Sequence, residues 1–426
     1  MASRRAVRKA AKAAKRHGGV VIAILVILVL VVAAGAVAYF KVDKVHDTVN
    51  ELIFGSSAAT NETNDGKQSL SGGAGSRAKD VLPKATTYGD DILSFHFLEL
   101  GNNFTGDSTY IKAGDIDILI DAGSRQDSAD AIAAYVDNYC TDGTLEFVIA
   151  THAHQDHIAG FTNTKTRDGI FKRYDCEIII DFALTNATSA VYNNYVAARD
   201  EEIALDPDTH KHYTALDCCK GTNGAQQTYV LGESMTMTIL YQRFYEEKTK
   251  DENNYSVCVL FNHGENYYLL TGDLEAEGEA SLVESNELPE VQLFKAGHHG
   301  SYTASTNALL SVIKPKIVCV CCCAGAVEYT QNLARTFPSQ EFIDRVAPYT
   351  ERIYVTTVGY IKRGLNKNGE EVWIDGGFSS MNGDITVLSE KGKVTVTCSN
   401  NDTVLKDTDW FKANRTCPSA WTDSSG

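Results

Sequence analysis

Four side chains that can bind a metal ion lie within six residues of this chain, directly after a hydrophobic segment. Residues 145–150 are mostly apolar and predict a buried strand, which runs into Thr-His-Ala-His-Gln-Asp-His at 151–157. The first two histidines are two residues apart, so they point the same way in an extended chain, and the following turn brings Asp and the last His to a second position. The candidate ligands are His152, His154, Asp156 and His157. This arrangement predicts two adjacent metal ions.

The chemistry of these ligands narrows the choice of metal. Imidazole and carboxylate together suit zinc, and also manganese or iron, whereas a calcium site would require oxygen ligands alone. A polar loop that is rich in histidine by chance is the alternative, but the position of the segment between a strand and a predicted helix argues against it. We therefore expect two divalent metal ions, with zinc as the first choice.

The cysteines predict neither a zinc ribbon nor a fully paired set of disulfides. There are 11 of them, an odd number, without two C-x-x-C pairs. A cluster at Cys319 and Cys321–Cys323 follows apolar, β-branched residues, which favours a core strand over a metal site. Cys398 and Cys417 are close enough in the sequence to pair near the end of the chain.

An uninterrupted apolar run at residues 20–40 predicts a transmembrane helix over residues 19–40. At about 1.5 Å per residue, such a run crosses a hydrocarbon core of about 30 Å. Seven Lys or Arg precede it and only Lys41 and Lys44 follow closely, so residues 1–18 are expected in the cytoplasm and the remainder outside the cell membrane. A cleaved signal peptide is the alternative, because residues 36–38 resemble a cleavage site, but the run exceeds the usual apolar length of about 7–15 residues.

The remaining chain divides into an expected stalk at 41–90 and one folded domain at 91–426. Residues 61–88 are rich in Gly, Ser, Thr and Asn and contain few large apolar side chains, so they cannot bury a core. Strands are predicted at 92–100, 108–112, 116–120, 145–150, 235–241, 256–261, 267–270, 316–320, 385–388 and 394–398. Helices are predicted at 128–139, 189–203, 275–284 and 304–313. This is a mixed α/β pattern, and the part after Arg352 is predicted to be mostly strand that closes a sheet.

The segment His-x-His-x-Asp-His after a hydrophobic strand resembles the signature of the metallo-β-lactamase fold superfamily. Other landmarks follow in the same order: Leu-Ile-Asp-Ala-Gly at 119–123, Leu-Leu-Thr-Gly-Asp at 269–273 and Lys-Ala-Gly-His-His-Gly-Ser at 295–301. The last of these, with Gly-Asp-Ser at 106–108, is similar to the ComEC-type competence branch. The resemblance covers roughly residues 92–325. It implies an αββα sandwich of two mixed sheets flanked by helices.

The resemblance also implies a role for each residue of the site. One metal takes His152 and His154, the second takes Asp156, His157 and His298, and Asp273 bridges both. Asp156 also orients the nucleophile, and His299 lies nearer the substrate, which makes these two the expected catalytic residues. Asp121 organises the metal loops without ligating. Lys295 either assists the substrate anion or is a surface lysine at the end of a strand.

Two stretches depart from the family pattern. Many members carry a further histidine before the bridging Asp, whereas residues 251–256 read Asp-Glu-Asn-Asn-Tyr-Ser here, so the first metal is expected to be held more weakly. His210, His212 and His263 are interpreted as surface residues that do not replace it. ComEC-type proteins resemble one another in Asn-x-Tyr-x-His-Pro after the Cys-rich strand, and residues 326–331 here read Ala-Val-Glu-Tyr-Thr-Gln.

The implied function is a membrane-anchored, extracytoplasmic hydrolase that cleaves small phosphodiesters or a cell-envelope substrate with a hydroxide supplied by the metals. The alternatives are a lactam, thioester or lactone hydrolase, a non-catalytic binding protein on the same scaffold, and a DNA nuclease as in ComEC-type proteins. Residues 1–44 hold nine of the 39 Lys and Arg and one of the 55 acidic residues, which leaves a net charge of −24 on the rest. Such a surface repels nucleic acid and disfavours the nuclease.

Overall fold

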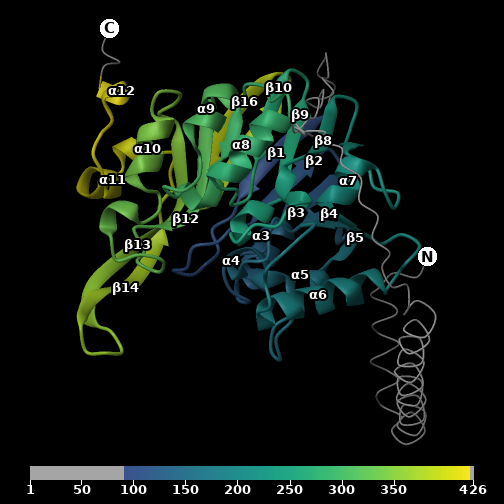
Figure 1. The fold of residues 1–426 in the computed structure, drawn as a ribbon, viewed down its shortest axis with the longest axis horizontal. Coiled ribbons are helices and arrows are strands. Elements are labelled where there is room, and N and C mark those ends of the chain that lie inside the picture. Colours follow the sequence, from purple (N-terminus) through teal and green to yellow (C-terminus); the bar gives the residue numbers. More distant parts are fainter. Residues whose placement is uncertain (1–90, 423–426) are drawn as a thin grey trace, which may run out of the picture. The chain divides into compact units, whose positions relative to one another are not determined.

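Two mixed β-sheets of eight strands each form the centre of the folded domain (Figure 1). The structure, a computed structural model, describes residues 91–422, which lie within one structural unit, Ser76–Gly426. The predicted transmembrane helix at 19–40 and the stalk at 41–90 lie outside the described residues. Within residues 91–422, no helix is both long and apolar enough to cross a bilayer.

The first sheet combines strands from the two ends of the described chain. In spatial order it contains β16 (Lys393–Cys398), β15 (Ile385–Glu390), β1 (Ile92–Phe97), β2 (Thr109–Ala113), β3 (Ile116–Ile120), β4 (Thr144–Ile149), β5 (Asp175–Asp181) and β6 (Lys211–Thr214). Strands β3 to β6 are parallel to one another, and the pairs from β16 to β3 are antiparallel.

The second sheet is formed by the middle of the chain. In spatial order it contains β14 (Glu371–Ser380), β13 (Ile353–Leu365), β12 (Ile317–Ala324), β11 (Leu293–Lys295), β10 (Asn266–Leu270), β9 (Cys258–His263), β8 (Met235–Leu240) and β7 (Thr228–Val230). The strands from β10 to β13 are parallel. Strands β13 and β14 continue beyond the sheet as a long antiparallel hairpin, which projects from the domain in Figure 1.

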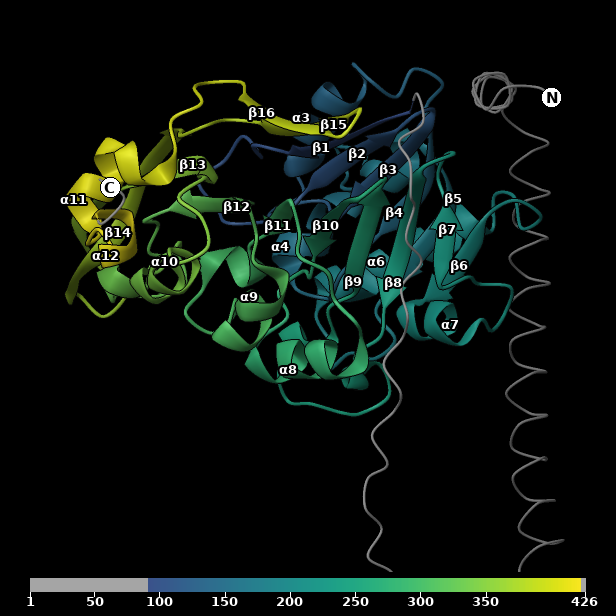
Figure 2. The same ribbon diagram turned by 90° about the horizontal axis from the view of Figure 1, so that it is seen from above.

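The core lies between the two sheets, and helices cover their outer faces (Figure 2). Phe95 of β1 stacks on Tyr268 of β10 with ring centroids 4.8 Å apart and meets Phe261 of β9 edge-on at 5.3 Å, which joins the sheets. The helices are α3 (Ser128–Val136), α4 (Gln155–Ile158), α5 (Ile170–Arg173), α6 (Ala190–Ile203), α7 (Ala215–Lys220), α8 (Ala276–Ser285), α9 (Asn307–Ile313), α10 (Gln340–Val346), α11 (Asp409–Asn414) and α12 (Ser419–Thr422). Apolar side chains of α8, α9 and α10 pack on the second sheet. The predicted sandwich of two mixed sheets flanked by helices is confirmed.

The Cys-rich segment is a core strand, as predicted. Cys319 and Cys321–Cys323 lie in β12 and are buried. All eleven cysteines are free, so Cys398 and Cys417 do not form the disulfide that their spacing suggested. The region after Arg352 is mostly strand, also as predicted, but it completes both sheets, because β13 and β14 extend the second and β15 and β16 the first. This division brings the last strands of the chain beside β1.

Candidate metal centre

The predicted ligands come together where parallel strands of both sheets end. His152 follows β4, Asp273 follows β10, and His299 lies in the 3₁₀ turn η4 (Gly297–Gly300) that follows β11. The carboxyl ends of parallel strands leave loops at one edge of a sheet, which is where α/β proteins usually place their sites. His152, His157 and His299 have no exposed surface, so the centre is built into the interior of the domain.

The first two histidines of the signature face each other. His152 Nε2 lies 2.9 Å from His154 Nδ1. On its other side, His152 Nδ1 lies 3.2 Å from Thr151 Oγ1 and 3.5 Å from Ser256 Oγ. Thr151 and Ser256 contact the Nδ1 atom of His152, so its Nε2 atom is directed at His154. The two imidazoles therefore bring His152 Nε2 and His154 Nδ1 next to each other.

A second group gathers around the carboxylate of Asp273. Its Oδ2 atom lies 3.0 Å from His157 Nε2 and 3.2 Å from His299 Nε2. His299 Nε2 also lies 3.4 Å from Asp156 Oδ2. Ligand atoms of Asp107, His157, Asp273 and His299 all lie within 4.8 Å of one another, which is the spacing of a metal site.

Several atoms of this group are buried without a hydrogen bond in the described part of the chain. They are His157 Nε2, His299 Nε2 and Asp273 Oδ1, whose charged neighbours are one another and Lys295, whereas Asp107 is paired with Lys295. A buried polar atom without a hydrogen bond costs about 1–3 kcal/mol, so these three atoms are suited to bind a cation. Nitrogen and carboxylate oxygen together suit zinc, manganese or iron. The residues therefore fit a divalent metal ion.

Residues behind the ligands fix which ring nitrogen faces the centre. His157 Nδ1 lies 2.7 Å from Asp121 Oδ2, and Asp121 also accepts hydrogen bonds from the N and Oγ1 atoms of Thr151, each at 2.8 Å. His299 Nδ1 lies 2.9 Å from the carbonyl oxygen of Cys321 and 3.2 Å from Asp107 Oδ1. Partners of this kind hold the tautomer and orientation of metal-binding histidines. Asp121 thus supports the centre from behind, the position that the family resemblance implied.

The electrostatics of the centre follow from burial and from its acids. Burial lowers the pKa of His152 well below its ordinary value, so this ring is neutral. Burial would also lower the pKa of His157, but Asp273 and Asp121 beside it raise the pKa well above the ordinary value. The pKa of His299 is raised in the same way by Asp273 and Asp107. Without metal these two rings therefore hold protons, and a bound metal would displace them.

The adjacent histidines exchange the places that the sequence analysis gave them. His299, expected near the substrate, lies in the centre, whereas His298, expected to be a ligand, places its Nδ1 atom 2.9 Å from Glu275 Oε1 and 3.0 Å from Thr303 Oγ1. The reason is the η4 turn, in which both histidines have left-handed backbone angles, φ 45° and φ 54°. Consecutive residues of so tight a turn point in different directions, and the sequence does not show which one points inward.

Lys295 and Asp107 belong to the interior of this region. Lys295 was predicted to be either a surface lysine or a contact for the substrate anion, but it is buried in an ion pair with Asp107, and its Nζ atom lies 3.9 Å from Asp273 Oδ1. The Gly-Asp-Ser motif alone gave Asp107 no role in the site. For Lys295, the apolar neighbours Leu293 and Phe294 in β11 were the signal in the sequence that its position is buried.

The segment that departs from the ComEC-type pattern contributes a residue that the sequence analysis missed. Tyr329 donates a hydrogen bond of 2.8 Å to Asp156 Oδ2, and Phe337 packs against the rings of Tyr329 and His299. Next to Tyr329, the carboxylate of Glu328 lies 2.8 Å from the guanidinium of Arg125. A tyrosine in a loop after a strand of the site was the only signal in the sequence.

The stretch without the expected histidine also reaches the centre. Ser256, its last residue, faces His152 and accepts a hydrogen bond of 3.0 Å from the backbone N–H of Asp273. His210, His212 and His263 lie in other contacts: His210 with Asp175, His212 with Asp181 and His263 with Ser389. The interpretation of His210 and His263 as surface residues is wrong, since both are buried.

Comparisons with known proteins find similarity to metallo-beta-lactamase proteins over part of the chain. The sequence profile of the metallo-beta-lactamase superfamily matches residues 101–167. Recombination protein 2 of Haemophilus influenzae is 35% identical over 72 residues, which is 17% of this chain and 9% of that protein, so the match spans a small part of the relative. Among solved structures, the metallo-beta-lactamase fold protein YhfI from Bacillus subtilis is 13% identical, with 62% of this chain and 86% of that one covered and a TM-score of 0.32. A metallo-beta-lactamase from Cronobacter sakazakii is 14% identical, with 45% and 74% covered and a TM-score of 0.27.

Proposed function

We propose that this chain, whose residues 101–167 match the profile of the metallo-β-lactamase superfamily, is a two-metal hydrolase that cleaves small phosphodiesters. The observation that carries the proposal is the set of buried nitrogen and carboxylate atoms around Asp273 that make no hydrogen bond in the described chain. His152 and His154 would hold one metal, and Asp156, His157 and His299 the other, with Asp273 between them. His299 replaces His298 in this assignment.

Each part of the centre has a role in such a reaction. Bound metals would supply a hydroxide at neutral pH and stabilise the charge on a phosphoryl oxygen. Asp121 and Cys321 hold the ligand histidines in one tautomer, so the site does not reorganise when substrate arrives. Asp107 forms an ion pair with Lys295 and so balances its positive charge, which allows this lysine to be buried behind the ligands.

The choice of a phosphodiester rests on the similarity to recombination protein 2 and on the ComEC-type landmarks. A nuclease that acts on long DNA is less favoured, because the chain after residue 44 carries a net charge of −24 and a long polyanion must approach it closely. A small phosphodiester or a short nucleotide carries few negative charges, so this acidic surface repels it much less. Hydrolysis of a lactam, thioester or lactone remains the second candidate on this fold.

The activity is tested on the full-length chain, purified in detergent and loaded in turn with zinc, manganese or iron. The substrates are bis(p-nitrophenyl) phosphate, p-nitrophenyl phosphate and a chromogenic lactam. We expect cleavage of the phosphodiester, loss of activity with a chelator, and loss in His154→Ala and Asp156→Ala but not in the surface control Asp115→Ala. Cleavage of the lactam alone, or full activity of Asp156→Ala, would refute the proposal.

We further propose that residues 19–40 anchor the chain in the cell membrane, with residues 1–18 in the cytoplasm and the hydrolase domain outside. Protease added to intact cells is then expected to cut near residues 72–75 and release the domain. Cleavage only after lysis would show the reverse orientation, and a secreted form that begins near Tyr39 would show a signal peptide instead.

A further inference from the structure

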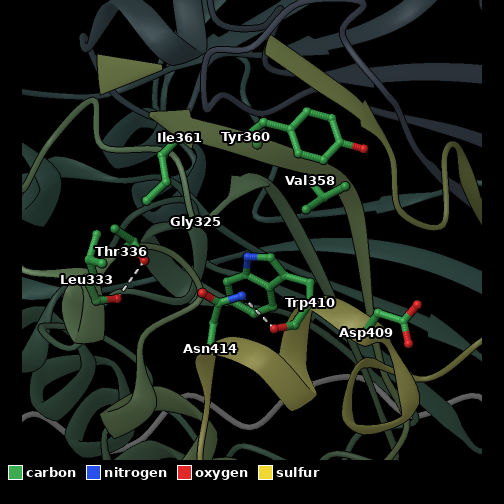
Figure 3. Close-up of a pocket in the computed structure, with 10 residues that line it drawn as sticks. Gly325, Leu333, Thr336, Val358, Tyr360, Ile361, Asp409, Trp410 and Asn414 are labelled. Atoms are coloured by element: carbon green, nitrogen blue, oxygen red, sulfur yellow. Dashed lines mark hydrogen bonds between the residues drawn. The ribbon is translucent and has the colours of Figure 1, made fainter. Parts of the chain in front are cut away.

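A cavity separate from the metal centre lies between strand β13, helix α11 and the segment 325–336 (Figure 3). Its volume is about 440 Å³, within the range of about 300–1,000 Å³ that is usual for pockets that hold small molecules. Trp410 and Tyr360 supply aromatic surface, Val358 and Ile361 supply aliphatic surface, and Asp409 and Asn414 supply polar groups from the exposed side of α11. The cavity therefore combines an apolar interior with a polar rim.

The indole of Trp410 is held in place before any ligand arrives. The guanidinium of Arg415 lies over the ring, 4.6 Å from its centroid. Arg415 in turn donates hydrogen bonds to the carbonyl oxygens of Leu333, Thr336 and Pro338. A Cβ atom at Gly325 would lie 2.6 Å from Trp410 Nε1, so the absence of a side chain there allows the ring to approach the backbone. A fixed aromatic ring loses little entropy when a ligand binds to it.

The polar rim offers hydrogen-bond acceptors. In residues 91–422, no hydrogen bond or ion pair involves the carboxylate of Asp409, which is exposed at the first turn of α11. Asn414 uses its Nδ2 atom for a hydrogen bond of 2.8 Å to the carbonyl oxygen of Trp410, which leaves its Oδ1 atom available (Figure 3). An ionised carboxylate accepts hydrogen bonds and does not donate them. A ligand that matches this rim must offer at least two hydrogen-bond donors.

Charge narrows the class of ligand further. The carboxylate of Asp409 repels phosphates and carboxylates. An organic cation is disfavoured on the Trp410 ring, because Arg415 already lies over that ring with a positive charge. What remains is a neutral molecule with an apolar face for the indole and several hydroxyl donors for the rim. From these contacts we infer that the cavity binds a neutral pyranose sugar, with its C–H face against Trp410 and its hydroxyls on Asp409 and Asn414.

This site stands apart from the proposed hydrolase activity, because no group of the cavity belongs to the metal centre. The segment between the two regions is nevertheless shared. Gly325, Leu333 and Thr336 line the cavity, while Tyr329 and Phe337 contact residues of the centre. A glycan held at Trp410 would therefore contact the same segment of the chain that contacts the metal centre.

The inference is tested by calorimetric titration of the full-length chain, with metal and after chelation, using maltotriose and the trimer of N-acetylglucosamine as sugars. Adenosine and tetramethylammonium serve as the neutral aromatic and the cationic alternatives. We expect one of the two sugars to bind with a Kd of about 1 mM, which corresponds to about −4 kcal/mol, and equally well without metal. Binding of adenosine or tetramethylammonium in place of both sugars, or binding of none of the four, would overturn the inference.

Variants locate the binding. Trp410→Ala is expected to abolish sugar binding, and Asp409→Asn, a change of one exposed side chain that cannot disturb the core, is expected to weaken it about tenfold through the loss of a charged acceptor. Trp373→Ala, in the hairpin outside the cavity, is the matched control and should bind as the unaltered chain does. Sugar binding that survives unchanged in Asp409→Asn and in Trp410→Ala would place the site elsewhere and refute the inference.

Discussion

Replacing Asp121 by asparagine should weaken metal binding through His157, a ligand that the substitution itself leaves in place. Asp121 Oδ1 accepts from the backbone N–H of Thr151, and an asparagine oxygen can keep that bond. In place of Oδ2 there would be an NH₂ group facing His157 Nδ1, now 2.7 Å away. Since that group is a donor, His157 Nδ1 becomes an acceptor and the ring must carry its proton on Nε2, the atom that lies 3.0 Å from Asp273. The ligand nitrogen is thus blocked.

The size of the effect follows from this tautomer change. Loss of a partner behind a metal-binding histidine typically costs 10- to 100-fold in affinity, or about 1.4–2.8 kcal/mol. The backbone of residue 121 has φ 60°, a left-handed angle that asparagine tolerates as well as aspartate does, so the loop should keep its conformation.

The measurement is zinc competition between a chromophoric chelator and the full-length chain. Asp115→Asn, in the exposed turn between β2 and β3, is the matched control and should bind zinc as the unaltered chain does. The thermal unfolding of metal-free Asp121→Asn should stay close to that of the metal-free unaltered chain. If the variant is folded and its zinc affinity lies within threefold of the unaltered value, Asp121 does not set the tautomer of His157 and the argument fails.

Three further predictions concern the centre, the core and the substrate. His299→Ala should lose bound metal, whereas His298→Ala should keep it, and metal analysis that gives the opposite order would restore His298 as the ligand. His96 is a buried residue of β1 that lies 2.8 Å from the hydroxyl of Tyr135, and burial lowers its pKa from 6.5 to about 4. The stability contributed by its neutral form is therefore complete above pH 6.5 and falls by about 3 kcal/mol between pH 6.5 and 4. Denaturant titrations at each pH should show that His96→Gln lacks this fall. If the acidic surface limits the access of DNA to the metal centre, cleavage of long duplex DNA should be poor at low salt and improve towards physiological salt. Tight binding of duplex DNA at low salt that weakens steeply with added salt would support the nuclease instead.

Local pattern was enough to find ten of the sixteen strands of residues 91–422 and the first half of the site. Strand β3 has the bounds that alternation and turn residues predicted, and β4 leads directly into the ligand sequence, because a buried strand and the loop that follows it are encoded by neighbouring residues. His152 and His154 lie on one side for the same reason, since residues two apart in an extended chain share a face.

Local sequence patterns could not predict the contacts between segments that are distant in the sequence. Whether His298 or His299 enters the centre depends on two left-handed residues in the η4 turn, and that backbone is fixed by the packing around it. Lys295 looks like a surface residue until β11 is seen between β10 and β12, where Asp107 from the other sheet meets it. Tyr329 reaches Asp156 only because a loop 173 residues further along the chain folds over the centre. Local sequence sets the direction of each side chain along its own strand, whereas the identity of its neighbour depends on how the two sheets pack.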